Sequence, residues 1–142
     1  MSEATQIEVG SGDELEVSLT GGIGRITMNR PDKRNPLSAT FADAMNAALD
    51  RLEGDPDCRV IILTGRGPVF CGGAELGSIV SAEEIDMEWQ YMVIRGVNRM
   101  IKRLRGLDLP VIAAVNGPAV GGGASLALAC DIAIAAPTAS YY

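Results

Sequence analysis

The stretch from Pro110 to Gly123 reads P-V-I-A-A-V-N-G-P-A-V-G-G-G, an apolar run that passes directly into a glycine-rich loop. The run Val111–Val115 is short, wholly apolar and opened by a proline, which is typical of a buried strand. The loop Asn116–Gly123 ends in three glycines, and its apolar continuation predicts a short helix over Ala124–Cys130. This part of the chain therefore reads as a strand, a loop and a helix in succession.

The same order occurs once upstream. Val60–Leu63 is a short apolar strand, the glycine-rich loop Gly65–Gly77 follows it, and apolar periodicity then predicts a long helix from about Ser81 to Leu104. Apolar strands that alternate with helices favour an α/β fold with parallel strands. In such folds ligands bind at the carboxyl ends of the strands. Both glycine-rich loops are expected at that edge of the sheet.

The N-terminal part supplies two further strands and a helix. Leu15–Leu19 and Gly24–Met28 flank the turn signal Thr20–Gly22, which predicts a β-hairpin. Residues 30–36 contain two prolines and are expected to be irregular. Residues 1–13 are polar and are expected to form a flexible N-terminus outside the domain.

The remaining boundaries follow from capping signals. Ser38 is a plausible N-cap for a helix that ends at Gly54, and a last strand is predicted over Ile132–Ala136. Residues 14–142 are therefore expected to belong to a single α/β domain.

Composition excludes several kinds of chemistry. The 142 residues carry 12 Lys and Arg against 18 Asp and Glu, a net charge of −6, which argues against a nucleic-acid-binding protein. The chain has no histidine, so it offers no Ser-His-Asp triad, Cys-His pair or H-E-x-x-H zinc motif. Its three cysteines form no C-x-x-C pair, and we expect no metal site and a reducing, cytoplasmic location. Neither a membrane span nor a signal peptide is predicted.

The two glycine-rich loops match no phosphate-binding motif. No Lys follows the glycines, and the full G-x-G-x-x-G pattern with its acidic partner is missing. Two interpretations stay open. The loops are simply tight strand-to-helix connections, or their exposed N–H groups, beside the positive end of a helix dipole, stabilise an anion. Two N–H groups that converge from neighbouring loops would form an oxyanion hole.

Four blocks of sequence resemble the crotonase (enoyl-CoA hydratase/isomerase) family. Residues 70–76, F-C-G-G-A-E-L, resemble its F-x-A-G-A-D signature, and residues 110–123 resemble P-x-I/V-A-A-V/I-x-G-x-x-x-G-G-G. Residues 126–131 continue as L-A-L-A-C-D, and residues 29–37 resemble N-R-P-x-x-x-N-A-L/M. The blocks stand in the family's order and cover the chain from about residue 14. The resemblance implies the N-terminal part of a crotonase-like ββα spiral with parallel strands.

The resemblance also assigns residues. The N–H groups of Ala74 and Gly122 would bind the thioester oxygen of an acyl-CoA. The backbone around Ala74, Glu75, Leu76 and Gly77 would hold the pantetheine arm and the adenine. Lys33 and Arg34 lie where the family often meets the CoA phosphates, although a solvated turn is an equal alternative. CoA would be part of the substrate, and no separate cofactor is expected.

Two departures from the family pattern bear on the chemistry. The family's hydratases use two glutamates, and Ser125 stands at the first of these positions. A serine hydroxyl is no carboxylate base, which favours isomerisation or another one-carboxylate reaction over hydration. Glu75 replaces the usual Asp, and a loop-capping carboxylate is the preferred interpretation over catalysis. Cys71, without an activating base, is expected to be an inert thiol.

The second glutamate is expected just beyond Tyr142. We therefore interpret the chain as a piece of a longer protein, truncated before the family's C-terminal helical region and inactive alone. The resemblance implies a lyase or isomerase of fatty acid metabolism that assembles as a homo-oligomer, a trimer or a hexamer. The alternative is a non-catalytic member that binds acyl-CoA or serves as a scaffold.

Overall fold

A computed structural model describes residues 5–7, 13–75 and 87–142 of the chain, with the side chain of Trp89 excepted. The core of the fold is one six-stranded sheet with the strands in sequence order. Its strands are β1 (Thr5–Ile7), β2 (Leu15–Thr20), β3 (Ile23–Met28), β4 (Val60–Gly65), β5 (Val111–Val115) and β6 (Ile132–Ala135). The strands β1, β2 and β3 pair antiparallel, and β3 to β6 pair parallel, which confirms the hairpin and the α/β class.

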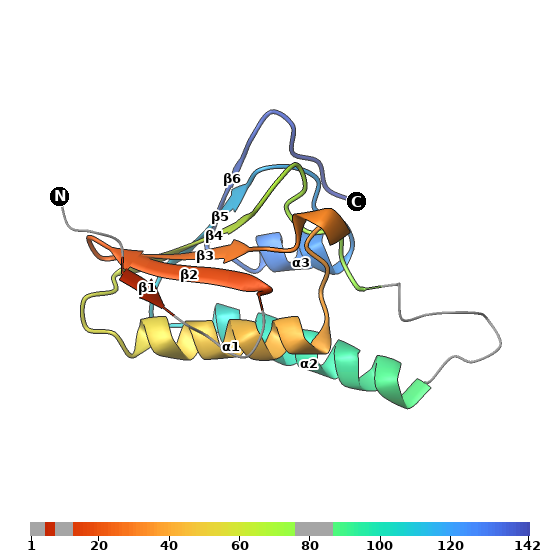
Figure 1. Cartoon of the computed structure of the whole chain (residues 1–142), viewed down its shortest axis with the longest axis horizontal. Helices are drawn as coiled ribbons and strands as arrows, with labels where there is room; N and C mark the ends of the chain where they lie inside the picture. The colour runs from red at the N-terminus through yellow and green to blue at the C-terminus, as the bar shows by residue number, and fades with distance from the viewer. Residues whose placement is uncertain (1–4, 8–12, 76–86) are drawn as a thin grey trace.

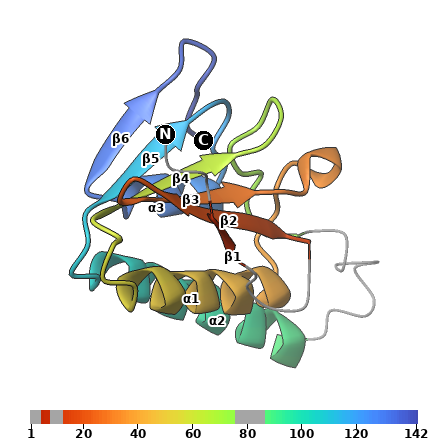
Figure 2. The same cartoon turned by 60° about the vertical axis from the view of Figure 1, so that its left-hand side comes forward.

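Helices connect the parallel strands. They are α1 (Ala39–Glu53), α2 (Met87–Arg105) and α3 (Gly122–Leu128), with a 3-10 turn η1 at Pro31–Lys33. Figures 1 and 2 show α1 and α2 side by side beneath the sheet, whereas α3 lies near the end of the sheet where the chain leaves β5. Ser38 caps α1 as predicted, because its side chain accepts a hydrogen bond from the Phe41 N–H.

Alternate residues of the central strands point into the core. The buried positions of β3 are Gly24, Ile26 and Met28, and β4 and β5 repeat the same alternation. The buried face of α1 packs against the same core. The largest fully buried side chains of the core are Phe41, Met45, Leu49 and Leu52 from α1 and Ile26, Met28, Leu37, Ile61, Leu63, Phe70, Met100 and Leu126 from elsewhere.

A second row of contacts gives each repeat its ββα character. Isolated parallel bridges join Leu37 to Ala74, Cys71 to Ala119, and Ala119 to Tyr141. In the chain, Leu37 lies between β3 and α1, Cys71 and Ala74 lie between β4 and α2, and Ala119 lies between β5 and α3. Tyr141 follows β6. The chain thus winds as a spiral of sheet strand, bridge segment and helix.

The structure differs from the sequence prediction at an N-terminal strand and at several element ends. Thr5–Ile7 form β1 within the N-terminal segment expected to be irregular, because these residues pair with β2. Helix α3 begins at Gly122 and ends at Leu128, not at Ala124 and Cys130, since the last two glycines of the triplet already have helical geometry. The described part of the long helix begins at Met87, and residues 81–86 lie outside the description.

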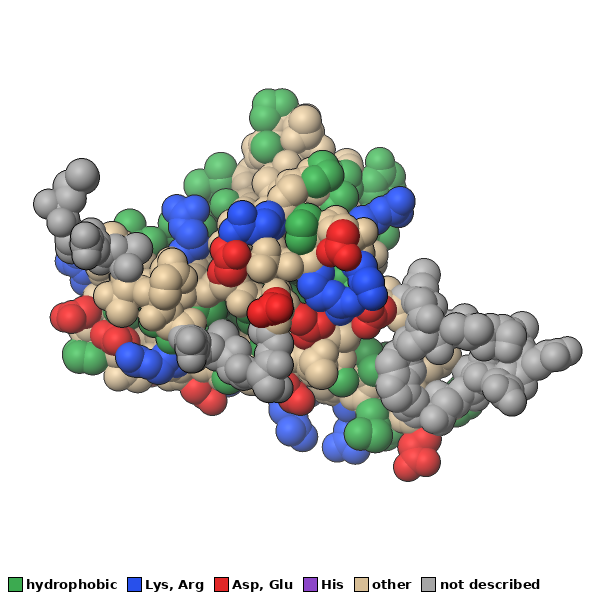
Figure 3. All heavy atoms as spheres, viewed as in Figure 1, with side chains coloured by type: hydrophobic (Ala, Val, Ile, Leu, Met, Phe, Trp, Pro, Cys, Tyr) green, Lys and Arg blue, Asp and Glu red, His purple; other side chains and the backbone are tan. Residues whose placement is uncertain are grey.

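The surface shows mixed charges. In Figure 3, acidic and basic side chains are interspersed over the face in view. Among the described residues, no helix combines the length and apolar character needed to cross a bilayer. No group of three or more potential metal-binding side chains occurs in this part of the chain.

Candidate functional site

Three loops meet at the carboxyl ends of the parallel strands. They follow β3, β4 and β5 and comprise residues 29–37, 66–75 and 116–121. Strand register brings them together, because Met28 lies opposite Gly65 and Thr64 lies opposite Ala114. We call these segments the first, second and third loops.

Backbone hydrogen bonds join the loops directly. The Leu37 N–H donates to the Gly73 carbonyl at 2.7 Å, and the Glu75 N–H donates to the Leu37 carbonyl at 3.1 Å. These two bonds bracket Ala74 on the second loop. The third loop is joined by the Val120 N–H, which donates to the Cys71 carbonyl at 2.9 Å.

The glycines permit this close approach. Gly73 has a φ of +86°, and a Cβ there would lie 2.6 Å from the Val120 oxygen and 3.7 Å from the Gly122 nitrogen. A Cβ at Gly123 would lie 2.4 Å from the Cys71 oxygen. Side chains at these positions would separate the second loop from the third. The glycine clusters are therefore needed for loop contact, beyond the turns themselves.

Two N–H groups at this junction are unpaired. Within the described part of the chain, neither the Ala74 N–H nor the Gly122 N–H donates a hydrogen bond. Their neighbours do: Gly121 donates to the Tyr142 carbonyl at 2.8 Å, and Gly123 donates to the Val120 carbonyl at 2.8 Å. Ala74 is exposed and Gly122 is partly exposed, so an acceptor from outside can reach this region. Both N–H groups are therefore available to an acceptor from outside, which makes this junction a candidate ligand site.

Asn35 is a structural residue of the site that sequence reasoning left without a role. It is only 2% exposed and has a left-handed φ of 49°, which asparagine adopts more readily than most residues. Its amide nitrogen donates to the carbonyls of Arg66 at 3.0 Å, Val69 at 2.9 Å and Phe70 at 3.3 Å. Its amide oxygen accepts from the Arg30 N–H at 2.9 Å. Asn35 thus fixes the second loop to the first.

Asn116 does the same between the second and third loops. Its side-chain oxygen accepts from the Gly65 N–H at 3.0 Å, and its nitrogen donates to the Gly67 carbonyl at 2.8 Å. Asn35 and Asn116 both lie within the stretches that resemble the family, residues 29–37 and 110–123. Their fixed place in those stretches is the sequence feature that could have indicated a defined structural partner.

Arg30 forms a second link that the sequence did not reveal. Its guanidinium donates to Glu14 at 2.8 Å and to Glu75 at 2.9 Å. Burial would lower the pKa of Arg30, but the hydrogen bonds to Glu75 and Glu14 outweigh it and raise that pKa above its ordinary value. The Glu75 carboxylate therefore binds a side chain of the first loop.

The other predicted residues are placed as follows. Lys33 and Arg34 are exposed, and the Arg34 carbonyl accepts from the Gly72 N–H at 2.7 Å, so their backbone borders the second loop. Ser125 is exposed, and its hydroxyl donates to the Gly121 carbonyl at 3.4 Å. Leu76 and Gly77 lie outside the described residues.

The Cys71 thiol has the character expected of it. It is fully buried, and burial raises its pKa to about 11, so it stays protonated and unreactive at neutral pH.

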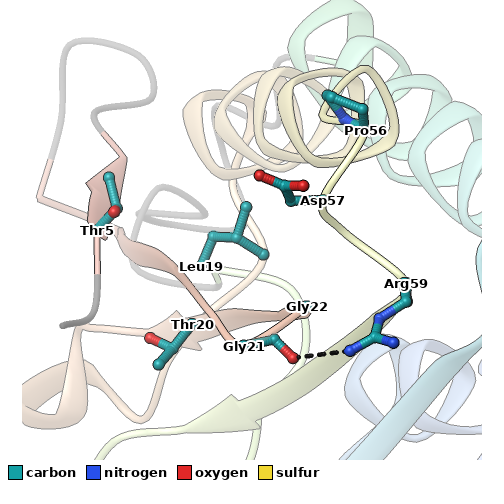
Figure 4. Close-up of a pocket in the computed structure, with 8 residues that line it drawn as sticks. All are labelled: Thr5, Leu19, Thr20, Gly21, Gly22, Pro56, Asp57 and Arg59. Carbon is teal, nitrogen blue, oxygen red and sulfur yellow. Dashed lines mark hydrogen bonds between the residues drawn. The ribbon is translucent and has the colours of Figure 1, made fainter. Parts of the chain in front are cut away.

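A pocket of about 510 Å³ lies elsewhere, at the amino ends of β3 and β4. Figure 4 shows its lining, in which an Arg59 nitrogen donates to the Gly21 carbonyl at 3.2 Å. Because this pocket is at the opposite edge of the sheet, it is separate from the three loops.

Comparisons with known proteins agree with one another. The family model described as enoyl-CoA hydratase/isomerase matches residues 18–142. A putative enoyl-CoA hydratase of Thermus thermophilus is 43% identical over 114 residues, which are 80% of this chain and 45% of that protein. The 4-chlorobenzoyl coenzyme A dehalogenase-2 of an Arthrobacter species is 36% identical over 92% of this chain and 48% of its own length.

A solved structure gives the same result. The crystal structure of enoyl-CoA hydratase from Bacillus anthracis superposes with a TM-score of 0.84 at 34% identity, over 91% of this chain and 50% of that one. The chain thus spans about half the length of the relatives it matches.

Proposed function

Because this chain belongs to the enoyl-CoA hydratase/isomerase family, as the N-terminal part of its crotonase fold, we propose that the three loops bind an acyl-CoA thioester. The carbonyl oxygen would accept from the Ala74 and Gly122 N–H groups. The observation that carries the proposal is that these two donors, one on the second loop and one at the start of α3, have no hydrogen-bond partner within the described residues.

The chemistry follows from where charge develops. When a proton leaves the carbon next to the thioester carbonyl, negative charge moves onto the carbonyl oxygen and an enolate forms. Donors already fixed toward that oxygen stabilise the enolate more than the neutral thioester, and this difference lowers the barrier. Backbone donors held by loop-to-loop hydrogen bonds need little reorganisation during the reaction.

The CoA portion would extend along the second loop. We assign the backbone of Ala74, Glu75, Leu76 and Gly77 to the pantetheine arm and adenine. Lys33 and Arg34, exposed beside Gly72, would meet the phosphates, since Lys and Arg both suit phosphate oxygens. CoA would arrive as part of the substrate.

Ser125 restricts the reaction. No carboxylate stands at this position, so we propose a reaction that needs a single base, with double-bond isomerisation favoured over hydration. Since the chain spans about half the length of its relatives, we assign that base, and full activity, to residues outside this sequence. A cytoplasmic homo-oligomer, trimer or hexamer, belongs to the same proposal. The three cysteines are free, which supports the proposed reducing compartment.

The absence of a carboxylate at Ser125 also supports the second candidate, a non-catalytic member that binds acyl-CoA without turnover. Proton exchange separates the two. The complete gene product that carries these residues is incubated with butyryl-CoA in D₂O, and deuterium at the carbon next to the carbonyl is measured by mass spectrometry. Exchange supports the enzyme, because it requires the enolate. Binding without exchange supports the scaffold, and failure to bind any CoA thioester would overturn both.

A further inference from the structure

Arg30 joins two carboxylates at the border of the proposed carbonyl site. The distances are 2.8 Å to Glu14 and 2.9 Å to Glu75, and the side chains of Arg30, Glu14 and Glu75 are 23%, 12% and 28% exposed. Partial burial limits screening by solvent, so these pairs are stronger than ion pairs on an open surface. We call this cluster the Arg30 bridge.

One end of the bridge is anchored in the sheet and in α1. The Glu14 carboxylate also accepts from the Ser38 hydroxyl at 3.0 Å, and Ser38 caps α1. The Arg30 N–H is held by the Asn35 side chain at 2.9 Å. These contacts hold the Arg30 guanidinium in place, and its ion pair with Glu75 in turn holds the Glu75 side chain.

The other end lies one residue from the proposed donor. Ala74 stands between Gly73, whose φ is +86°, and Glu75. Glycine restricts the Ala74 peptide less than any other residue would. The restraints on this peptide include the two hydrogen bonds to Leu37 and, at the following residue, the bridge.

We propose that Arg30 is a positioning residue, which orients the Ala74 N–H through its ion pair with Glu75. The effect on a bound thioester rests on the proposed function. The orientation of the Ala74 N–H by Arg30 does not. Arg30 touches no reacting atom in this scheme. Its effect would pass through Glu75 to the direction in which the Ala74 N–H points.

The test uses substitutions that weaken the bridge by removing a charge or the guanidinium fork. Arg30→Gln and Glu75→Gln each remove one charge, and Arg30→Lys keeps the charge but loses the planar fork that reaches two carboxylates. Arg103→Gln is the matched control. Arg103 also binds two carboxylates, Asp50 at 2.8 Å and Glu53 at 2.6 Å, and is 29% exposed, but it joins α2 to α1.

The first readout needs no ligand. In ¹⁵N-labelled protein, the Ala74 amide resonance should move and its hydrogen exchange should accelerate in Arg30→Gln and Glu75→Gln. The Arg103→Gln control should leave both unchanged. An Ala74 amide that is unaffected in both bridge variants would overturn the inference, whatever the protein binds.

The second readout tests the consequence for the thioester in the complete gene product. Infrared spectra of bound, ¹³C-labelled crotonyl-CoA should show a carbonyl band that is shifted less in both bridge variants than in the unmodified protein. Turnover should fall about 10-fold to 10²-fold in kcat with a smaller change in KM, because a misdirected donor acts mainly on the transition state. The double variant should lose no more than the worse single variant.

The outcomes separate the two proposals. If the unmodified protein shifts the carbonyl band and the bridge variants shift it equally, the role of Arg30 is wrong and the carbonyl site stands. If the unmodified protein binds no thioester, the proposed function fails, and the Ala74 amide still decides whether the bridge positions this peptide. An equal loss in Arg103→Gln would identify general destabilisation and refute the inference.

Discussion

Replacement of Gly122 by proline removes one proposed donor and leaves the hydrogen bonds of the fold intact. Gly122 is the first residue of α3, the position at which helices tolerate proline best. Its N–H donates to no described residue, so no bond is lost. Gly121 before it has φ +52° and ψ −115°, outside the α region that a following proline disfavours.

The magnitude follows from two separate effects. Any side chain at Gly122 would place its Cβ 2.8 Å from the Leu37 Cδ1 atom, and such overpacking typically costs about 1–3 kcal/mol of stability. Loss of one oxyanion donor typically lowers kcat about 10²–10³-fold, or about 2.7–4 kcal/mol of transition-state stabilisation. Alanine introduces the same Cβ but keeps the N–H. The ratio of the alanine rate to the proline rate therefore isolates the donor.

The assay compares Gly122→Ala and Gly122→Pro in the complete gene product, with turnover of a CoA thioester and thermal melting measured on both. We expect similar melting temperatures and a rate ratio of about 10²–10³ in favour of alanine. Equal turnover in two folded variants would show that the Gly122 N–H does not bind the carbonyl oxygen.

Three further predictions concern Ser125, Asn35 and Glu53. Crotonyl-CoA hydration, followed by absorbance, should be slow in the complete gene product, and Ser125→Glu should raise it by as much as about 10²–10⁴-fold if a second carboxylate is present; fast hydration by the unmodified protein would contradict our reading of this position. Asn35→Ala should lower the free energy of unfolding by about 2–4 kcal/mol in urea titrations, because loop carbonyls and the Arg30 N–H lose their partner; a change below about 0.5 kcal/mol would contradict this role. The pKa of Glu53 is lowered first by the hydrogen bond from Arg103 and then by the hydrogen bond from the Asp108 N–H. The ionised Glu53 therefore stabilises the fold fully above the ordinary pKa of 4.5, and this stabilisation is lost as the pH falls through the lower pKa of the folded state. Glu53→Gln should therefore flatten the acid side of the stability profile below the ordinary carboxylate pKa of 4.5, and an unchanged profile would refute this assignment.

Most strands and helices could be predicted because their signals are local. An apolar run such as Val111–Val115 needs no knowledge of its partners to be recognised as a buried strand. Strand β1 was missed because Thr5–Ile7 carry little signal of their own, and its existence depends on pairing with Val17, Ser18 and Leu19. The start of α3 was misplaced because glycine has low helix propensity, and tertiary contacts override that preference at Gly122 and Gly123.

Some features of the candidate site could likewise be predicted from the sequence, and others could not. The glycines at 73 and 123 could be predicted as positions of close approach, because their lack of a side chain is visible in the sequence. The partners of Arg30 could not, because its two carboxylates come from the turn before β2 and from the second loop, 16 and 45 residues away. The same holds for Asn35, which binds carbonyls that only the folded second loop presents.

The arrangement explains how a chain without histidine can carry part of an active site. Its proposed contribution is two backbone N–H groups, and no side-chain substitution other than proline removes such a donor. The donors are held by strand register, by glycine contacts and by Asn35 and Asn116, none of which takes part in proton transfer. The base could therefore change, as we propose for the position of Ser125, while the proposed carbonyl site stays the same. This separation is consistent with a family whose members include proteins named as hydratases and others named as dehalogenases. What differs between reactions would then lie in the side chains around a constant pair of backbone donors.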